Sequence, residues 1–270
     1  MNNFVKRTLS GALLVTLIVG SILLGGIAFA AFFGLICAGA VQEFQKLTNT
    51  QEQISVNIWT ASIGALLLFG CSFLYISGNA QFSVFSAYGI FIVLVFVAEL
   101  YRQKSNPLHN WAYFILGQVM VALPFALVPS ILYIDGYQPI ILLSVFVTIW
   151  VNDTGAYLFG VQLGKHRLFE RISPKKSWEG FIGGALTALL SGYIFSLFVP
   201  SLTLLQWLVF SEIIVVFSTF GDLLESMLKR TVHVKDSGDV IPGHGGILDR
   251  FDSLLLAAPV IFIYLTLILK

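Results

Sequence analysis

Carboxylates recur near the ends of apolar segments, and their spacing places them on shared helix faces. Asp222, Glu225, Ser226 and Lys229 stand at i, i+3, i+4 and i+7. Residues at these spacings lie on one side of an α-helix. The segment therefore predicts a helix that presents carboxylates, a hydroxyl and a lysine along a single face.

Two other segments bring carboxylates to a similar depth. Asp249 and Asp252, at i and i+3, open the last apolar run, and Asp153 lies near the end of an earlier run. A carboxylate inside a membrane segment is unfavourable by roughly 2.5–3.5 kcal/mol, so a cluster of them indicates function. Facing carboxylates can hold a hard divalent cation such as Mg²⁺, which prefers oxygen ligands and keeps positions for substrate phosphates. Interfacial ion pairs with nearby Lys and Arg residues are the alternative.

Two polar loops combine basic residues with glycines. Residues 173–180 read SPKKSWEG immediately before an apolar run, which is typical of an anion site at a helix start. A basic loop that only contacts lipid headgroups is an equal alternative. Residues 235–252 contain KDSG, PGHGG and DRFD. Glycines there let backbone N–H groups approach a phosphate, and His244 is a candidate for proton transfer or for donation to a phosphate oxygen.

The rest of the chain must be a membrane scaffold for these groups. Hydrophobic residues make up 57% of the 270 residues and charged residues only 11%, against about 25% charged in soluble domains. Because so few charges cannot cover a water-facing surface, lipid is the solvent for most of the chain. The net charge of +1 excludes a nucleic-acid-binding surface. Cys37 and Cys71 lie in apolar runs and are predicted to pack there, without disulfide or metal-ligand spacing.

Apolar runs long enough to cross a bilayer recur along the whole chain. A hydrocarbon core of about 30 Å needs roughly 17–25 residues per helix. This criterion predicts an all-α polytopic membrane protein with about nine transmembrane helices. The predicted spans are 8–24, 27–45, 56–76, 82–100, 110–133, 138–160, 180–199, 203–229 and 249–269. The first five form an N-terminal region, 1–135, and the last four form a C-terminal catalytic region, 136–270.

Positive charges predict the orientation. With the N-terminus in the cytoplasm, fourteen of the 15 Lys and Arg residues fall in cytoplasmic segments and Lys270 alone falls outside. This asymmetry follows the positive-inside rule and supports both the number of spans and a cytoplasmic N-terminus. Lys6 and Arg7 ahead of an apolar stretch also resemble a signal peptide, but the next runs are as long, so we interpret the stretch as the first span.

The stretch from Ser226 to Asp252 resembles the signature of the phosphatidate cytidylyltransferase family, also called CDP-diacylglycerol synthases. It reads SMLKRTVHVKDSGDVIPGHGGILDRFD. Further segments fit that family in the same order: WVNDTGAY at 150–157, SPKKSWEG at 173–180, and Gly221-Asp222 ahead of Glu225-Ser226. The resemblance covers roughly residues 140–260, and the first 130 residues match in hydropathy alone.

The resemblance implies that CTP and phosphatidate react to give CDP-diacylglycerol and pyrophosphate, with Mg²⁺ as cofactor. Both reactants are anionic, so the reaction needs charge neutralisation and in-line positioning more than a covalent nucleophile. The predicted metal ligands are Asp153, Asp222, Glu225 and Asp249. The predicted catalytic and phosphate-neutralising residues are Lys176, Glu179, Lys229, Arg230, Lys235, Asp236, His244, Arg250 and Asp252. The predicted substrate contacts are Ser173, Lys175, Ser177, Ser226, Ser237, Gly245 and Gly246.

The expected partners are CTP, phosphatidate and the lipid bilayer, with no nucleic acid, and the family resemblance implies a homodimer. The expected location is a bacterial inner membrane, with the active site facing the cytoplasm. A CTP-dependent polyprenol or phytol kinase is the nearest alternative, and the complete DSG, PGHGG and DRFD signature favours the cytidylyltransferase. A transporter would place polar residues in both halves of the membrane, whereas here they crowd one side. A non-catalytic scaffold leaves the clustered carboxylates unexplained.

Overall fold

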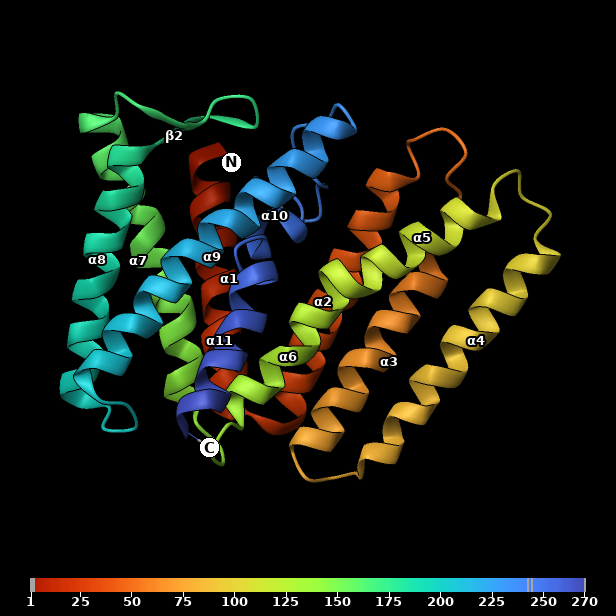
Figure 1. The fold of residues 1–270 in the computed structure, drawn as a ribbon, viewed down its shortest axis with the longest axis horizontal. Coiled ribbons are helices and arrows are strands. Elements are labelled where there is room, and N and C mark those ends of the chain that lie inside the picture. The colour runs from red at the N-terminus through yellow and green to blue at the C-terminus, as the bar shows by residue number, and fades with distance from the viewer. Residues whose placement is uncertain (1–2, 242, 244, 270) are drawn as a thin grey trace.

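Helices dominate the computed structural model, which describes residues 3–241, 243 and 245–269 (Figure 1). The helical elements are α1 (Asn3–Leu24), α2 (Gly26–Thr48), α3 (Ile58–Ile76), the 3-10 turn η1 (Phe82–Val84), α4 (Phe85–Tyr101), α5 (Pro107–Gly117), the π-helical turn η2 (Gln118–Ala122), α6 (Leu123–Leu132), α7 (Pro139–Leu163), α8 (Trp178–Phe198), α9 (Leu204–Thr231), α10 (Leu248–Phe251) and α11 (Leu254–Leu269). Within the described residues, the strands are β1 (Arg167–Phe169) and β2 (Ser173–Ser177).

Nine stretches of the described residues are long and apolar enough to cross a membrane. Each coincides with a predicted span, and the bounds differ by three residues at most. The fifth stretch runs through α5, η2 and α6, and the ninth runs from α10 into α11. The prediction of an all-α, multi-pass membrane protein is therefore confirmed.

The long helices of the C-terminal region begin at recognisable start signals. Pro139 occupies the first turn of α7, where its missing N–H breaks no intrahelical hydrogen bond. The hydroxyl of Ser177 accepts a hydrogen bond from the N–H of Gly180 (3.1 Å) and caps α8. Thr203 and Gln206 form a reciprocal capping box at the start of α9. These signals fix where each helix begins, and hence where its polar residues lie.

The polar segments gather at one end of the helix bundle in Figure 1. The N-terminal end of α1, the β1–β2 hairpin, the α4–α5 turn and the segment between α9 and α10 lie at the upper end. The C-terminal end of α11 lies at the opposite end, with the α3–α4 and α8–α9 turns. The fold therefore groups the positively charged loops on one side, as the charge pattern predicts.

The segment between the sixth and seventh spans is a hairpin, whereas the sequence predicted a loop. β1 and β2 pair antiparallel, with Arg167 opposite Ser177 and Phe169 opposite Ser173. Strands are recognised in a sequence by alternation between a buried and an exposed face. These short strands are mostly exposed, so they carry no such alternation. The hairpin matters because β2 presents Lys175 and Lys176 ahead of α8.

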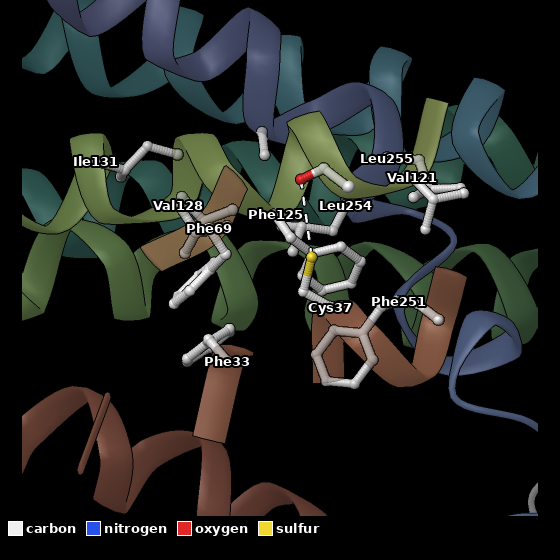
Figure 2. Close-up of a cluster of buried hydrophobic side chains, with 14 of the residues drawn as sticks. Phe33, Cys37, Phe69, Val121, Phe125, Val128, Ile131, Phe251, Leu254 and Leu255 are labelled. Atoms are coloured by element: carbon white, nitrogen blue, oxygen red, sulfur yellow. Dashed lines mark hydrogen bonds between the residues drawn. The ribbon is translucent and has the colours of Figure 1, made fainter. Parts of the chain in front are cut away.

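One apolar core joins the N-terminal and C-terminal regions (Figure 2). The ring of Phe251, between Asp249 and Asp252 in the sequence, packs against Phe125 of α6 with the ring centroids 5.7 Å apart. Cys37 is buried in the same core, and its thiol donates to the backbone carbonyl of Ala122 (3.8 Å). Packing of Phe251 against the N-terminal region therefore orients the helix start that carries both aspartates.

Candidate active site

Small residues let α7 and α8 pack at short range. A Cβ added to Gly155 would clash with the hydroxyl of Thr187, and a Cβ added to Gly180 would lie 2.8 Å from the carbonyl oxygen of Ala156. Small residues at such positions allow the close backbone approach typical of membrane helix pairs. The Thr187 hydroxyl also donates a hydrogen bond to the carbonyl of Val151 (3.3 Å). This contact joins the middle parts of α7 and α8, and the close approach of Gly180 to Ala156 places the start of α8 beside the polar half of α7.

A similar close approach joins α9 to the last span. A Cβ added to Gly221 would lie 2.5 Å from the carbonyl oxygen of Asp252 and 3.2 Å from the backbone of Ser253. The neighbouring Asp222 and Asp252 interact electrostatically, and Asp153 of α7 interacts with Asp252 as well. Carboxylates from α7, α9 and the α10–α11 junction therefore converge, as the depth of their helices in the membrane predicts.

Two cavities meet at Asp153 and Asp222, and the first of them, which we call the lysine cavity, has a volume of about 280 Å³. Lys176 Nζ forms an ion pair with Asp222 Oδ2 at 2.7 Å, and Asp222 Oδ1 accepts a hydrogen bond from the Ser226 hydroxyl (3.1 Å). Lysines, a hydroxyl and aromatic rings therefore share one pocket, a combination that suits a phosphorylated ligand with a planar ring. The lining residues are Asn152, Asp153, Ala156, Tyr157, Gly160, Leu168, Lys175, Lys176, Ser177, Gly180, Phe181, Thr219 and Asp222.

The second cavity, which we call the carboxylate cavity, has a volume of about 310 Å³. Four aspartates and Arg250 border its polar end, and its other wall is apolar and comes from α1, α7 and α11. Such a cavity suits a molecule with an anionic head and an apolar body. The lining residues are Leu14, Val15, Ile18, Phe146, Ile149, Trp150, Asp153, Asp222, Asp249, Arg250, Phe251, Asp252, Ser253 and Leu254.

Lys229 joins two carboxylates that are almost completely buried. Its Nζ lies 2.6 Å from Glu225 Oε2 and 2.7 Å from Asp249 Oδ1, and the exposed fraction of the side chain is 0% for Glu225 and 13% for Lys229. The other oxygen of Asp249 accepts hydrogen bonds from the backbone N–H groups of Ser237 (2.9 Å) and Gly246 (2.7 Å). Lys229 thus serves as an internal counter-ion that ties α9 to the segment before α10. Its contact with a substrate phosphate stays a prediction.

The oxygen atoms around the carboxylate cavity suit a hard cation, although they are not gathered into a coordination shell. Within the described ranges, no three His, Cys, Asp or Glu side chains lie close enough together to hold a metal ion. Asp222 and Asp249 are each paired with a lysine. Beside Asp153, the buried amide oxygen of Asn152 accepts no hydrogen bond from the described residues. This oxygen-rich donor set is the kind that Mg²⁺ prefers, so the donors fit the ion, and the assignment of individual ligands stays a prediction.

Glu179 and Arg230, two of the predicted catalytic residues, bind the β1–β2 hairpin and border neither cavity. Glu179 accepts hydrogen bonds from the backbone N–H groups of Lys165 (3.1 Å) and His166 (3.2 Å), and its carboxylate lies 2.6 Å from the Nδ1 of His166. Arg230 donates from its Nε to the carbonyl of Ile172 (3.5 Å). Glu179 therefore fastens the hairpin to the start of α8, and Arg230 fastens it to the end of α9.

The segment between α9 and α10 divides the remaining predicted residues. Lys235 and Asp236 are exposed and border neither cavity. Ser173 of β2 is half-buried and also borders neither cavity. Gly245 has a φ of +79°, and a Cβ there would lie 2.6 Å from Asp249 Oδ2. Ser237, Gly245 and Gly246 therefore surround Asp249. His244 lies outside the described residues.

Sequence reasoning missed two buried polar residues near the site. Glu43 of α2 accepts hydrogen bonds from the hydroxyl of Ser237 (3.0 Å) and the N–H of Leu248 (2.8 Å). A single acid near the end of a long apolar helix looks like an interfacial residue, so no pattern marks it. Asn152 was detectable, because it forms a polar pair with Asp153 inside an apolar run.

Comparison with known proteins connects this geometry to a family. The sequence matches the cytidylyltransferase family over residues 5–268. It is 35% identical to a phosphatidate cytidylyltransferase of Bacillus subtilis in an alignment 274 positions long that covers 97% of both chains. A phosphatidate cytidylyltransferase of Haemophilus influenzae is 47% identical over 131 residues, 46% of each chain. One of Staphylococcus saprophyticus is 46% identical over 125 residues, 46% of this chain and 48% of that protein. The chain therefore belongs to the cytidylyltransferase family.

Proposed function

We propose that this chain is a phosphatidate cytidylyltransferase, an enzyme that transfers the CMP moiety of CTP to phosphatidate. The products are CDP-diacylglycerol and pyrophosphate, in a step of phospholipid biosynthesis. The observation that carries this proposal is the 35% identity to the Bacillus subtilis phosphatidate cytidylyltransferase over 97% of both chains. The geometry supports the same function, because a basic cavity and an amphipathic cavity meet at two aspartates of a membrane protein.

The reaction forms one P–O bond and breaks another. A phosphate oxygen of phosphatidate attacks the α-phosphorus of CTP, the bond from that phosphorus to the oxygen bridging the β-phosphate breaks, and pyrophosphate leaves with the electron pair. Both reactants are anions, so positioning and neutralisation of charge are the main requirements. A covalent intermediate on the protein is not part of this mechanism.

The lysine cavity fits the nucleotide. Lys175 and Lys176 line it, and Ser177 lies at the start of α8, where backbone N–H groups favour anions. Tyr157 and Phe181 also line the cavity and offer apolar surface for a planar base. The triphosphate would then extend from the hairpin toward Asp222.

The carboxylate cavity fits phosphatidate. Its apolar wall from α1, α7 and α11 matches the acyl chains, and the exposed Arg250 on its border supplies positive charge for the lipid phosphate. Because Asp153 and Asp222 border both cavities, the two reacting phosphates would meet at these residues.

Mg²⁺ is the proposed cofactor, with Asp153, Asp222, Glu225 and Asp249 as its ligands. Two of these carboxylates already lie 2.7 Å from an ammonium group, Asp222 from Lys176 and Asp249 from Lys229, which supports their use in binding a cation. When bound, the ion would neutralise phosphate charge and help to orient the reacting oxygens.

The proposed location is a bacterial inner membrane, with the N-terminus and both cavities on the cytoplasmic side. The relatives named above are bacterial proteins, and fourteen of the 15 Lys and Arg residues fall on the side that this orientation makes cytoplasmic. CTP would enter from the cytosol, and the phosphate of phosphatidate would lie at the headgroup plane. A homodimer stays a prediction from the family resemblance.

Labelled CTP distinguishes this function from that of a CTP-dependent lipid kinase, which the comparisons do not favour. With label at the α-phosphorus, the proposed reaction transfers label to lipid when phosphatidate and Mg²⁺ are present. With label at the γ-phosphorus, the label is recovered in pyrophosphate. Transfer of γ-label to lipid would exclude the cytidylyltransferase and support the kinase.

A further inference from the structure

The carboxylate of Glu43 is buried at the junction between the N-terminal region and the segment that precedes α10. It lies on α2 and is 2% exposed. Its Oε1 accepts a hydrogen bond from the N–H of Ile247 (2.9 Å), and its Oε2 accepts from the N–H of Leu248 (2.8 Å) and the hydroxyl of Ser237 (3.0 Å). A buried carboxylate needs this degree of hydrogen bonding, because burial of an unpaired charge is strongly unfavourable.

Two glycines of the α9–α10 segment pack directly against this carboxylate. A Cβ added to Gly238 would lie 2.7 Å from Glu43 Oε1, and a Cβ added to Gly246 would clash with both Oε2 and the Ser237 hydroxyl. Neither glycine has a positive φ. Close approach to Glu43, rather than backbone strain, therefore requires glycine at both positions.

Asp249 also binds the same segment. Its Oδ2 accepts the N–H of Ser237 and of Gly246, and its own N–H donates to the Ser237 hydroxyl (3.3 Å). Ser237 thus contacts both carboxylates at once. The two acids together hold the segment in place, and Asp249 in turn borders the carboxylate cavity and pairs with Lys229.

We infer that Glu43 is a positioning residue for the cytidylyltransferase reaction. It fixes the segment around Ser237, Gly238 and Gly246, so that Asp249 and Asp252 keep their places opposite Asp153 and Asp222. Glu43 itself borders neither cavity and does not touch the reacting atoms. This inference rests on the proposed function, and it gives the N-terminal region a direct part in shaping the active site.

The inference predicts a split between kcat and the KM for CTP in the Glu43→Gln variant. The glutamine keeps the size of the side chain but replaces one acceptor oxygen with an NH₂ group, which cannot accept the hydrogen bonds now made by Oε1 or Oε2. No residue between 223 and 252 lines the lysine cavity, so CTP binding is preserved and the KM for CTP should stay within about twofold. The kcat should fall roughly ten- to hundredfold, because a displacement of about 1 Å in a catalytic constellation can have an effect of about 10²-fold.

Glu99→Gln is the matched control. Glu99 is also a buried acid of the N-terminal region, on α4, hydrogen-bonded to Arg102 (2.6 Å) and Asn110 (2.5 Å). It borders neither the lysine cavity nor the carboxylate cavity. Its replacement should lower the unfolding temperature without lowering the kcat of the folded protein. If both variants lose kcat only in proportion to the fraction that is folded, Glu43 is a structural residue and the inference is wrong.

A second pair of variants covers the case in which Glu43→Gln does not fold. Gly238→Ala adds one methyl group against Oε1 and should lower kcat, whereas Gly89→Ala, where no atom lies within 4 Å of the added Cβ, should not. Combining Gly238→Ala with Glu43→Asp, which shortens the acidic side chain by one methylene, should restore part of the kcat lost in Gly238→Ala alone. Absence of any restoration would overturn the inference. Absence of phosphatidate-dependent CMP transfer by the wild-type protein would instead overturn the proposed function.

Discussion

Replacement of either site lysine, Lys176 or Lys229, by methionine should abolish activity, but only the Lys229 variant should also lose stability. Lys229 pairs with Glu225 and Asp249, whose side chains are 0% and 6% exposed. Lys229→Met would leave two buried carboxylates without a counter-ion, and breaking a buried pair in this way reduces stability by about 3–5 kcal/mol. The variant is expected to unfold at a clearly lower temperature and to lose activity as a consequence.

Lys176 is in a more open setting, since the side chains of its pair with Asp222 are 26% and 35% exposed. Pairs of this kind contribute about 0–1 kcal/mol to stability. A charge-assisted contact to a phosphate contributes roughly 1.5–3 kcal/mol, equivalent to about ten- to hundredfold in rate when it is made in the transition state. Lys176→Met should therefore keep the fold and lose turnover.

The assay can use the protein's own cysteines, because Cys37 and Cys71 are free and only 0% and 5% exposed. A thiol-reactive fluorogenic dye then reports the unfolding of detergent-solubilised protein during heating, and CMP transfer is measured on the same samples. Full turnover in Lys176→Met would return residues 173–180 to the role of a lipid-contacting loop. An unchanged unfolding temperature in Lys229→Met would refute the assignment of Lys229 as an internal counter-ion.

Three further predictions concern the topology, the contacts of Asp249 with the segment between α9 and α10, and the metal. Reporter fusions after Lys104 and Lys165 should lie in the cytoplasm and fusions after Gly78 and Gly136 outside it, and a cytoplasmic signal at Gly136 would contradict nine spans. Asp249→Asn should lower both turnover and unfolding temperature, because its amide NH₂ cannot accept the hydrogen bonds that the backbone N–H groups of Ser237 and Gly246 now donate to the carboxylate. An unfolding temperature equal to wild type would show that Asp249 does not hold this segment. Chelation of divalent ions should abolish CMP transfer and added Mg²⁺ should restore it, and transfer that persists in excess chelator would rule out the metal.

The membrane spans could be predicted closely, and the hairpin could not, for physical reasons. A bilayer imposes a nearly fixed length on each apolar run, so the predicted spans 82–100 and 203–229 lie within two residues of the observed 82–101 and 204–231. β1 and β2 bury no apolar face, so no periodicity distinguishes them from a loop. The convergence of Asp153, Asp222 and Asp252 was predictable because antiparallel spans bring the C-terminal halves of α7 and α9 to the same side of the bundle as the start of the last span.

The partners of individual charges were not predictable from spacing. Asp249 was selected as a metal ligand, and the spacing gave no sign that its oxygens also contact Lys229 and backbone N–H groups of a loop. Backbone donors leave no trace in a sequence. Glu43 was missed for a related reason, because its contacts with Ser237 and Leu248 join residues about two hundred positions apart.

The central claim is that CMP transfer takes place where the carboxylates of α7, α9 and the last span converge. A pair of acids on α9 tests it most directly. Asp222 borders both cavities, whereas Glu212 lies in an apolar pocket with Leu189 and Phe217, and one of its oxygens accepts no hydrogen bond from the described residues. Transfer of CMP labelled at its phosphorus from CTP to phosphatidate should be lost in Asp222→Asn and retained in Glu212→Gln. The thiol assay should show that both variants are folded. Retained transfer in Asp222→Asn, or its loss in Glu212→Gln alone, would contradict this placement of the active site.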